Sequence, residues 1–178
     1  MRLAFISFLF MFVSCTNDPH LVSELFEDKK LPIEIIEKSN LIHTENGLIK
    51  LEIIANKIER FIDDSPRLLF SEGFEVIFYD NSSNIISTLK AKNADVDEVN
   101  SIMRASNSVV LSNKTKTLET EYLIWDEKKD KIYTEKDVII TTEKEKIYAK
   151  GFSSDPNFND YTLNKISGKM YILSLIHI

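Results

Sequence analysis

The sequence is poor in the residues that most often carry chemistry or break up a fold. Its three histidines, His20, His43 and His177, lie far apart in the chain and predict no metal cluster. It contains no recognisable serine nucleophile elbow, glycine-rich phosphate loop or catalytic Cys–His pair. We therefore expect no catalytic residues, no metal and no cofactor. With only four glycines and four prolines in 178 residues, the chain is neither low-complexity nor disordered.

Positive charge is also scarce. The chain has 22 Lys and Arg against 28 Asp and Glu, a net charge of −6, and no basic cluster. A nucleic-acid partner would require a basic stripe to neutralise phosphates, so no nucleic acid is expected. Acidic pairs such as Asp95 with Asp97 and Glu119 with Glu121 have the composition of a glycosidase site. Their predicted places at turns and on exposed strand faces favour solvated charges instead.

The N-terminus has the features of an export signal. Met1-Arg2 precedes eleven uncharged residues, 3–13, a run that is too short to span a bilayer. The segment Phe12-Val13-Ser14-Cys15 looks like a bacterial lipobox, in which the cysteine becomes the acylated first residue of the mature protein. The alternative is a plain secretory signal with an incidental cysteine. We predict a lipoprotein signal peptide at residues 1–15, with Cys15 as the lipid anchor.

A 29-residue repeat organises the rest of the chain. Leu89, Ala91, Ala94, Val96 and Asp97 recur as Leu118, Thr120, Leu123, Trp125 and Asp126, and Ile147, Ala149, Phe152 and Asp155 complete a third copy. Self-similarity at such a fixed period indicates stacked units. Within a unit, polar turn formers such as 126–130 separate runs of Val, Ile, Tyr, Phe and Thr with period-two alternation. We predict an all-β chain whose units stack to bury one continuous apolar face.

Turn signals divide the chain into segments. Residues 16–46 carry few strand signals and end in the turn at Asn46-Gly47, so we predict a linker there. Disorder, or one short element that docks on the domain, is the alternative. Residues 47–170 form the predicted β domain. Residues 171–178 break the pattern, resemble the translated end of a sequencing adapter and are predicted to be a non-native tail.

Several segments of the β domain follow specific residue patterns. Residues 70–80 show the pattern Phe-x-Glu-Gly-x-Glu-Val-x-Phe-Tyr-Asp, and residues 118–126 show the most specific one, Leu-x-Thr-Glu-x-Leu-x-Trp-Asp. Together with residues 87–91 and 148–155, these segments resemble the LptC family, the periplasmic component of lipopolysaccharide export. The resemblance covers roughly 47–168. Better-known members carry an N-terminal transmembrane helix, so a lipid anchor is a departure from them.

The resemblance implies a fold and a role. The fold is an open β-jellyroll of the OstA/LptA-like repeat architecture, with two facing antiparallel sheets that open into a V. The role is non-enzymatic: a periplasmic bridge subunit receives lipopolysaccharide from an ATP-binding-cassette transporter and passes it along an apolar groove to the next jellyroll. The chain would be periplasmic and anchored to the inner membrane through lipidated Cys15. The alternative is a generic extracytoplasmic β-sandwich binding module.

The resemblance also implies partners. Lipopolysaccharide is the cargo, and the permease jellyrolls of the ABC transporter would contact the N-terminal edge of the domain, near 48–55. An LptA-like bridge protein would contact the C-terminal edge, near 147–168. Unpaired strand edges can extend a sheet into such neighbours by β-augmentation.

Alternation along the strands selects the candidate lipopolysaccharide groove. Its residues are predicted to share one face of successive strands: Phe74, Val76, Phe78, Leu89, Ala91, Val109, Leu111, Leu118, Thr120, Val138, Ile140, Ile147 and Ala149. The small members, together with Ala55, are expected to keep the inside open. Periodicity alone favours a closed core filled by the same residues, and only the family resemblance favours a groove. Residues 122–125 are apolar on both faces, which predicts a β-bulge.

Overall fold

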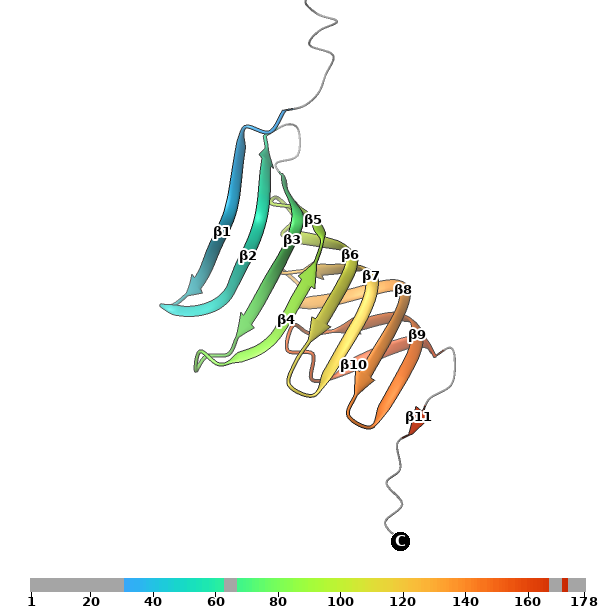
Figure 1. Ribbon diagram of the computed structural model, residues 1–178. Helices are drawn as coiled ribbons and strands as arrows, with labels where there is room; N and C mark the ends of the chain where they lie inside the picture. Colours follow the sequence, from blue (N-terminus) through green and yellow to red (C-terminus); the bar gives the residue numbers. More distant parts are fainter. Residues whose placement is uncertain (1–30, 63–66, 167–170, 173–178) are drawn as a thin grey trace, which may run out of the picture. The chain divides into compact units, whose positions relative to one another are not determined.

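The protein is described by a computed structural model that covers residues 31–62, 67–166 and 171–172. From Pro32 onward the chain forms one compact unit, shown in Figure 1. The described elements are β1 (Glu34–Glu45), β2 (Leu48–Phe61), β3 (Arg67–Tyr79), β4 (Ile85–Ala91), β5 (Asn93–Asp97), β6 (Ile102–Ser112), β7 (Lys116–Asp126), β8 (Lys131–Thr142), β9 (Glu145–Ser154), β10 (Tyr161–Ile166) and β11 (Tyr171–Ile172). Since every one of them is a strand, the all-β prediction is confirmed.

All of these strands belong to one antiparallel sheet. Its order is β1-β2-β3-β4-β6-β7-β8-β9-β10, with β5 between β3 and β6 and with β11 paired to β9. Most strands therefore lie beside their neighbour in sequence, and the hairpins follow one another along the sheet (Figure 1). The exceptions are β5, which pairs with β3 and β6 but not with β4, and β11, which pairs with β9 but not with β10. The 29-residue repeat corresponds to one such pair of long strands, as in β7 with β8.

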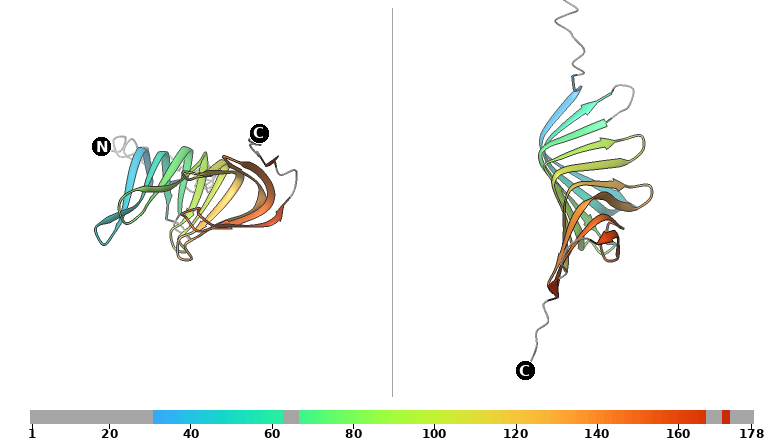
Figure 2. Two further views of the ribbon diagram at one scale, coloured as in Figure 1. Left: turned by 90° about the horizontal axis from the view of Figure 1, so that it is seen from below. Right: turned by 90° about the vertical axis from the view of Figure 1, so that its right-hand side faces the viewer.

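The sheet is folded along a crease where the strands change register. Shifts occur between Ala55 and Lys57 in β2, between Ser106 and Val109 in β6, and between Thr134 and Asp137 in β8. The register between β7 and β8 also shifts between Thr120 and Ile124, but the extra residue lies in β8, since residues 121–123 face 134–137. The bulge predicted at 122–125 of β7 is therefore not found in that strand. Extra residues of this kind bend a strand and increase its twist. Figure 2 shows the result, with strands that converge on one side and spread apart on the other.

Unusual backbone conformations and cross-strand bonds hold the crease. Glu72 and Asn107 have positive φ angles of 64° and 65°, and Gly73 and Gly151 have 101° and 82°. The Gly73 amide donates to Lys92 O at 2.9 Å, and the Lys92 amide donates to Asn107 O at 3.0 Å. These bonds satisfy backbone groups that the irregular ladder would leave unpaired.

The crease divides the sheet into two facing arms. The first arm ends at the β1–β2, β3–β4, β6–β7 and β8–β9 turns, and the second arm ends at the β5–β6, β7–β8 and β9–β10 connections. Two facing layers joined at bulged corners form a jellyroll-like fold, so the fold-class prediction is confirmed. The hydrophobic core lies between the arms, where Phe78 of the first arm meets Trp125 of the second at a ring distance of 5.1 Å.

The sheet extends further in both directions than the predicted domain. β1 lies within the stretch 16–46 that was predicted as a linker, and β11 lies within the predicted tail 171–178. The N-terminal edge was placed near 48–55, and this placement was wrong because β2 pairs with both β1 and β3. Among the described strands the edge is β1, whose weak alternation follows from its exposure. The signal peptide and Cys15 lie outside the described residues.

Candidate functional site

The thirteen predicted groove residues all lie on the inner face of the first arm. They come from β3, β4, β6, β7, β8 and β9, and each is between 0% and 8% exposed. The structure therefore brings them together as one continuous apolar surface. Residues of the second arm cover this surface, chiefly Ile58, Phe70, Met103, Leu123 and Ile132. Whether lipid contacts the thirteen residues stays a prediction.

The interior opens at the N-terminal end of the sheet. A cavity of about 370 Å³ lies there between the arms, and it is lined mainly by apolar side chains: Leu41, Leu51, Ile53, Leu68, Phe70, Val96, Met103 and Trp125. The arms diverge here because β1 has no further described strand beside it to close the fold. This cavity is the deep compartment of the site.

A second cavity of about 480 Å³ adjoins the deep compartment. It shares His43, Leu51, Trp125 and Glu127 with it, so the two form one continuous opening, which we call the open groove. The second cavity is its polar rim compartment, bordered by the turns of both arms, including Asp80 and Asp130. Both volumes fall in the range of roughly 300 to 1,000 Å³ that is usual for ligand sites.

Most residues of the open groove were missed by the sequence prediction. Of the thirteen predicted positions, only Phe78 borders it. The 29-residue alignment did contain a signal, because Val96 and Trp125 occupy equivalent positions in successive copies and both line the deep compartment. Alternation identifies which side chains face inward, but it does not reveal where the two arms stand apart.

Trp125 occupies the junction of the two compartments. Its ring is 8% exposed and packs edge-on against Phe78 at an interplanar angle of 84°. Its Nε1–H is buried and has no hydrogen-bond acceptor among the described residues. A buried indole N–H usually finds a partner, so this donor is a point of potential ligand contact.

Beyond the rim compartment, the interior is closed by the β9–β10 connection, residues 155–160, which we call the strap and whose Pro156 and Asn157 border that compartment. It belongs to the second arm but bonds to the first: Ser87 Oγ donates to Pro156 O, and Asn113 Nδ2 donates to Phe158 O at 2.9 Å. Phe158 is fully buried and packs against Phe152 at 5.6 Å between ring centroids. The strap therefore bridges the mouth of the V and seals the half of the fold that contains β6 to β9.

Aspartates shape the turns at the tips of the second arm. Asp97 accepts hydrogen bonds from the Asn100 amide at 3.0 Å and from Asn100 Nδ2 at 2.7 Å. Asp126, which is 29 residues later, accepts from the Lys129 amide at 3.1 Å and from Lys129 Nζ at 2.7 Å. The bonds from these side chains are the largest cause that lowers the pKa of each carboxyl group. Both carboxylates are thus turn supports and not groups poised for catalysis.

The small residues of the predicted groove, together with Ala55, lie at the crease. Ala55, Ala91, Thr120 and Ala149 lie next to the register shifts of the crease or to its positive-φ residues, and none borders the open groove. Ala55 and Ala91 pair with buried Phe74 on either side, so their small side chains leave room for its ring at the crease. These two alanines therefore allow the sheet to fold sharply there.

The described part of the chain contains neither a candidate metal cluster nor a candidate membrane-spanning helix. Residues 31–62, 67–166 and 171–172 contain no group of three His, Cys, Asp or Glu side chains that could hold a metal ion. Within the same ranges, no helix is long and apolar enough to cross a membrane.

The fold and the site together define a class of protein: an open β-jellyroll with an apolar groove between two arms. The sequence model of the family described as "Lipopolysaccharide-assembly, LptC-related" matches residues 3–165, nearly the whole chain. The chain therefore belongs to the LptC family, and membership implies a role in lipopolysaccharide transport. The family is associated with the periplasm and the inner membrane and works with the lipopolysaccharide transporter. No curated protein matches the sequence.

Proposed function

We propose that this chain is a periplasmic bridge subunit that takes lipopolysaccharide from the transporter and passes it to the next jellyroll. In this proposal acyl chains enter the open groove and the sugar head group stays at the polar rim. The protein supplies a surface and no chemical step. Cys15, when lipidated, holds it at the inner membrane.

The open groove is the observation that carries this proposal. Its deep compartment is apolar, while its rim is polar and is formed by turns from both arms. Complete enclosure would trap the cargo, because burying a twelve-carbon chain releases on the order of 10 kcal/mol at about 0.8 kcal/mol per methylene. A groove that is open along one side covers the chains only partly, so the cargo can leave.

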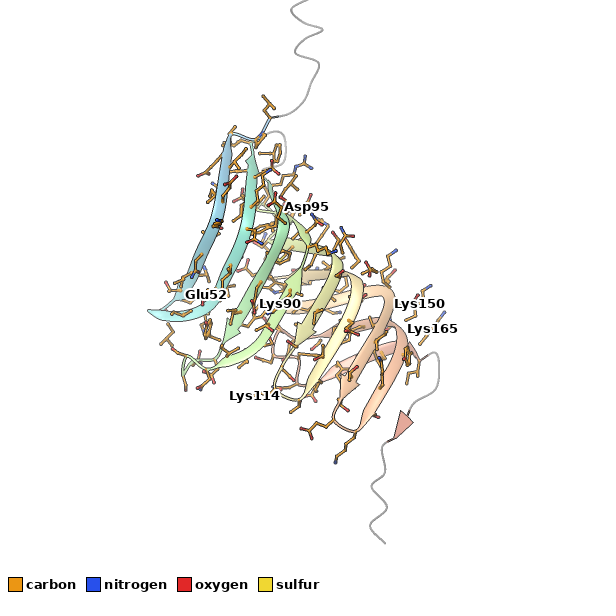
Figure 3. All side chains as sticks on the ribbon, in the orientation of Figure 1. Glu52, Lys90, Asp95, Lys114, Lys150 and Lys165 are labelled. Atoms are coloured by element: carbon orange, nitrogen blue, oxygen red, sulfur yellow. The ribbon has the colours of Figure 1, made fainter. Side chains whose placement is uncertain are left out.

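The edge strands support transfer between neighbouring proteins. β1 and β10 end the described sheet on either side, and each leaves a row of backbone groups without a described partner strand. Ile35 and Ile42 of β1 are 53% and 57% exposed. At the opposite end Lys150 and Lys165 lie side by side, as Figure 3 shows. We propose that β1 pairs with the transporter's periplasmic jellyrolls and that β10 pairs with an LptA-like protein.

Site-specific photo-crosslinking in cells tests this function. A photoreactive residue replaces Leu41, Leu51 or Leu68 in the open groove, and in separate strains it replaces Leu111 or Ile140 in the sealed half. Outward-facing Lys131 is the control. We expect lipopolysaccharide adducts at the groove positions, none at Lys131, and loss of all adducts when ATP hydrolysis is blocked.

The sealed-half positions decide between two modes of transport. Adducts at Leu111 and Ile140 that require ATP hydrolysis would mean that the arms separate as cargo passes, as the predicted groove requires. Adducts found only at the open-groove positions would mean that the cargo contacts the N-terminal end of the fold and does not enter the sealed half. Absence of adducts at every position would contradict the proposal and favour the generic binding module, which the dense packing of the thirteen residues fits.

A further inference from the structure

Five carboxylates surround the mouth of the open groove. They are Glu45, Asp80, Glu98, Glu127 and Asp130, and they come from turns or strand ends of both arms. Among the described residues that line the two compartments, Lys50 is the one lysine or arginine. Its Nζ donates to Asn81 Oδ1 at 2.7 Å. The mouth therefore has a net negative charge.

Nearby basic groups offset only part of this charge, and the histidine among them does so only when it is protonated. Arg60 Nη2 lies 3.8 Å from Glu98 Oε1, and His43 Nε2 lies 3.6 Å from Glu45 Oε1. The lysines of the β7–β8 turn are directed elsewhere, since Lys128 Nζ donates to Val99 O at 2.9 Å and Lys129 Nζ pairs with Asp126 at 2.7 Å.

Three of the five carboxylates, Asp80, Glu127 and Asp130, form no ion pair with a described residue. Asp80 accepts hydrogen bonds from the Ser82 amide and from Asn84 Nδ2, so Glu127 and Asp130 are the two to consider further. Both are exposed, and both border the rim compartment where a head group would lie.

Trp125 gives a second and independent sign of a ligand at this place. It borders both compartments, it is more than nine-tenths buried, and its Nε1–H has no acceptor among the described residues. A donor in this state is suited to an uncharged oxygen, such as an ester or amide carbonyl at the base of an acyl chain. The carbonyl of a lipid would then lie at the junction, with its chain in the deep compartment and its head group beside Glu127 and Asp130.

We propose that the mouth of the groove selects lipids whose head groups carry little negative charge, and that it disfavours doubly phosphorylated head groups. This inference rests on the proposed lipid-carrying function and specifies its cargo. Two charges of like sign a few ångströms apart in water repel each other by about 0.6 kcal/mol after screening, which is roughly threefold in affinity per added charge. Phosphates beside Glu127 and Asp130 experience this repulsion. A glycolipid with phosphates removed, or masked by amine groups, avoids it.

The sole tryptophan of the chain makes the test direct. The full chain in a neutral detergent, with EDTA to remove bridging cations, is titrated with acyl-matched lipids that carry bromine on one chain. Bromine quenches Trp125 only at short range. The three lipids share a disaccharide head group and carry two, one or no phosphates. We expect each phosphate to raise the half-saturating concentration roughly threefold, with a smaller difference in high salt.

Matched variants assign the effect to the mouth. E127Q/D130N removes two negative charges at the rim, and E119Q/E121Q removes two from the exposed outer face of β7. We expect E127Q/D130N to bring the half-saturating concentrations of the three lipids closer together. We expect E119Q/E121Q to leave the differences between these concentrations unchanged. If all three lipids had equal half-saturating concentrations, or if both variants had the same effect, the inferred head-group selectivity would be wrong. Lipid binding in the open groove would still be supported in either case. If none of the lipids quenched Trp125, the proposal that the open groove binds lipid would be contradicted.

Discussion

Gly151 lies at the point of the crease where β9 meets the edge strand β10. Its φ angle of +82° favours glycine, and an added Cβ would lie 2.5 Å from Asn164 Nδ2 and 2.9 Å from Asn164 Cβ. We expect Gly151→Ala to lower the free energy of unfolding by about 2–4 kcal/mol, from backbone strain and overpacking together. Chemical denaturation measures this loss.

Gly47, in the β1–β2 turn, supplies the matched control for this variant. It has a similar φ angle of +78°, but an added Cβ would have nothing within 4 Å. Gly47→Ala should therefore show the backbone cost alone, about 1–2 kcal/mol. Equal losses for the two variants would show that the contact with Asn164 contributes nothing.

The aspartates at the second-arm tips give the protein an acid-sensitive component of stability. Hydrogen bonds lower the pKa of Asp97 and Asp126 below the usual value of 3.8. A lowered folded-state pKa stabilises the fold fully above the unfolded-state pKa, and this contribution is lost as pH falls through the folded-state value. We expect the wild-type free energy of unfolding to decrease from about pH 4 downward.

Replacement by asparagine tests this pH dependence, because asparagine keeps an acceptor oxygen but cannot titrate. D97N/D126N should be less stable than wild type at pH 7 and should show a flatter decline below pH 4. Denaturant titrations at several pH values provide the measurement. Asp137, an exposed residue whose carboxylate accepts no hydrogen bond from a described residue, gives the control variant D137N. A decline as steep in D97N/D126N as in wild type would contradict the assignment.

Among the elements, the strap determines how firmly the sealed half is closed. Phe158 lies fully buried between Phe152 and Tyr161, at ring distances of 5.6 Å and 5.9 Å. We expect Phe158→Ala to cost about 3–5 kcal/mol of stability, as is usual for a buried phenylalanine. It should also accelerate hydrogen exchange in β9 and β10, because the strap loses its packing against Phe152 and Tyr161.

A second strap variant separates the ring from the hydrogen bonds. Ser87→Ala removes the bond to Pro156 O and leaves a buried carbonyl unpaired, which costs about 1–3 kcal/mol. A loss for Phe158→Ala no greater than that for Ser87→Ala would show that the arms are held mainly by polar contacts.

The strap is an element whose position could not be predicted from the sequence. Local alternation was sufficient to predict the strands and the inward side of each, since side chains on successive residues point to opposite faces. Phe158 sits in a polar loop, and its burial depends on a contact with an arm that is distant in sequence. The crease was equally hard to predict, because its positive φ angles at Glu72 and Asn107 occur at residues other than glycine. Edge strand β1 was missed because an exposed strand has little apolar alternation.

At the scale of the whole molecule, the two edges of the sheet differ in charge. β1 carries Glu34, Glu37 and Glu45 against Lys38, whereas β10 carries Lys165 and no carboxylate. Complementary charges favour association of unlike edges, and like charges oppose the pairing of two identical edges. The proposed bridge therefore has a direction, with a different neighbour at each end.

Photo-crosslinking with charge reversal tests this directionality. A photoreactive residue at exposed Ile42 of β1 should capture one protein, and one at exposed Thr162 of β10 should capture another. We expect Glu37→Lys to reduce only the adducts at Ile42 and Lys165→Glu to reduce only those at Thr162, each by roughly two- to fivefold, since exposed charge pairs contribute about 0.2–1 kcal/mol. Each variant is the control for the other edge. Capture of the same protein at both positions would show that the edges are equivalent, and a bridge with a fixed direction would then require another source of asymmetry.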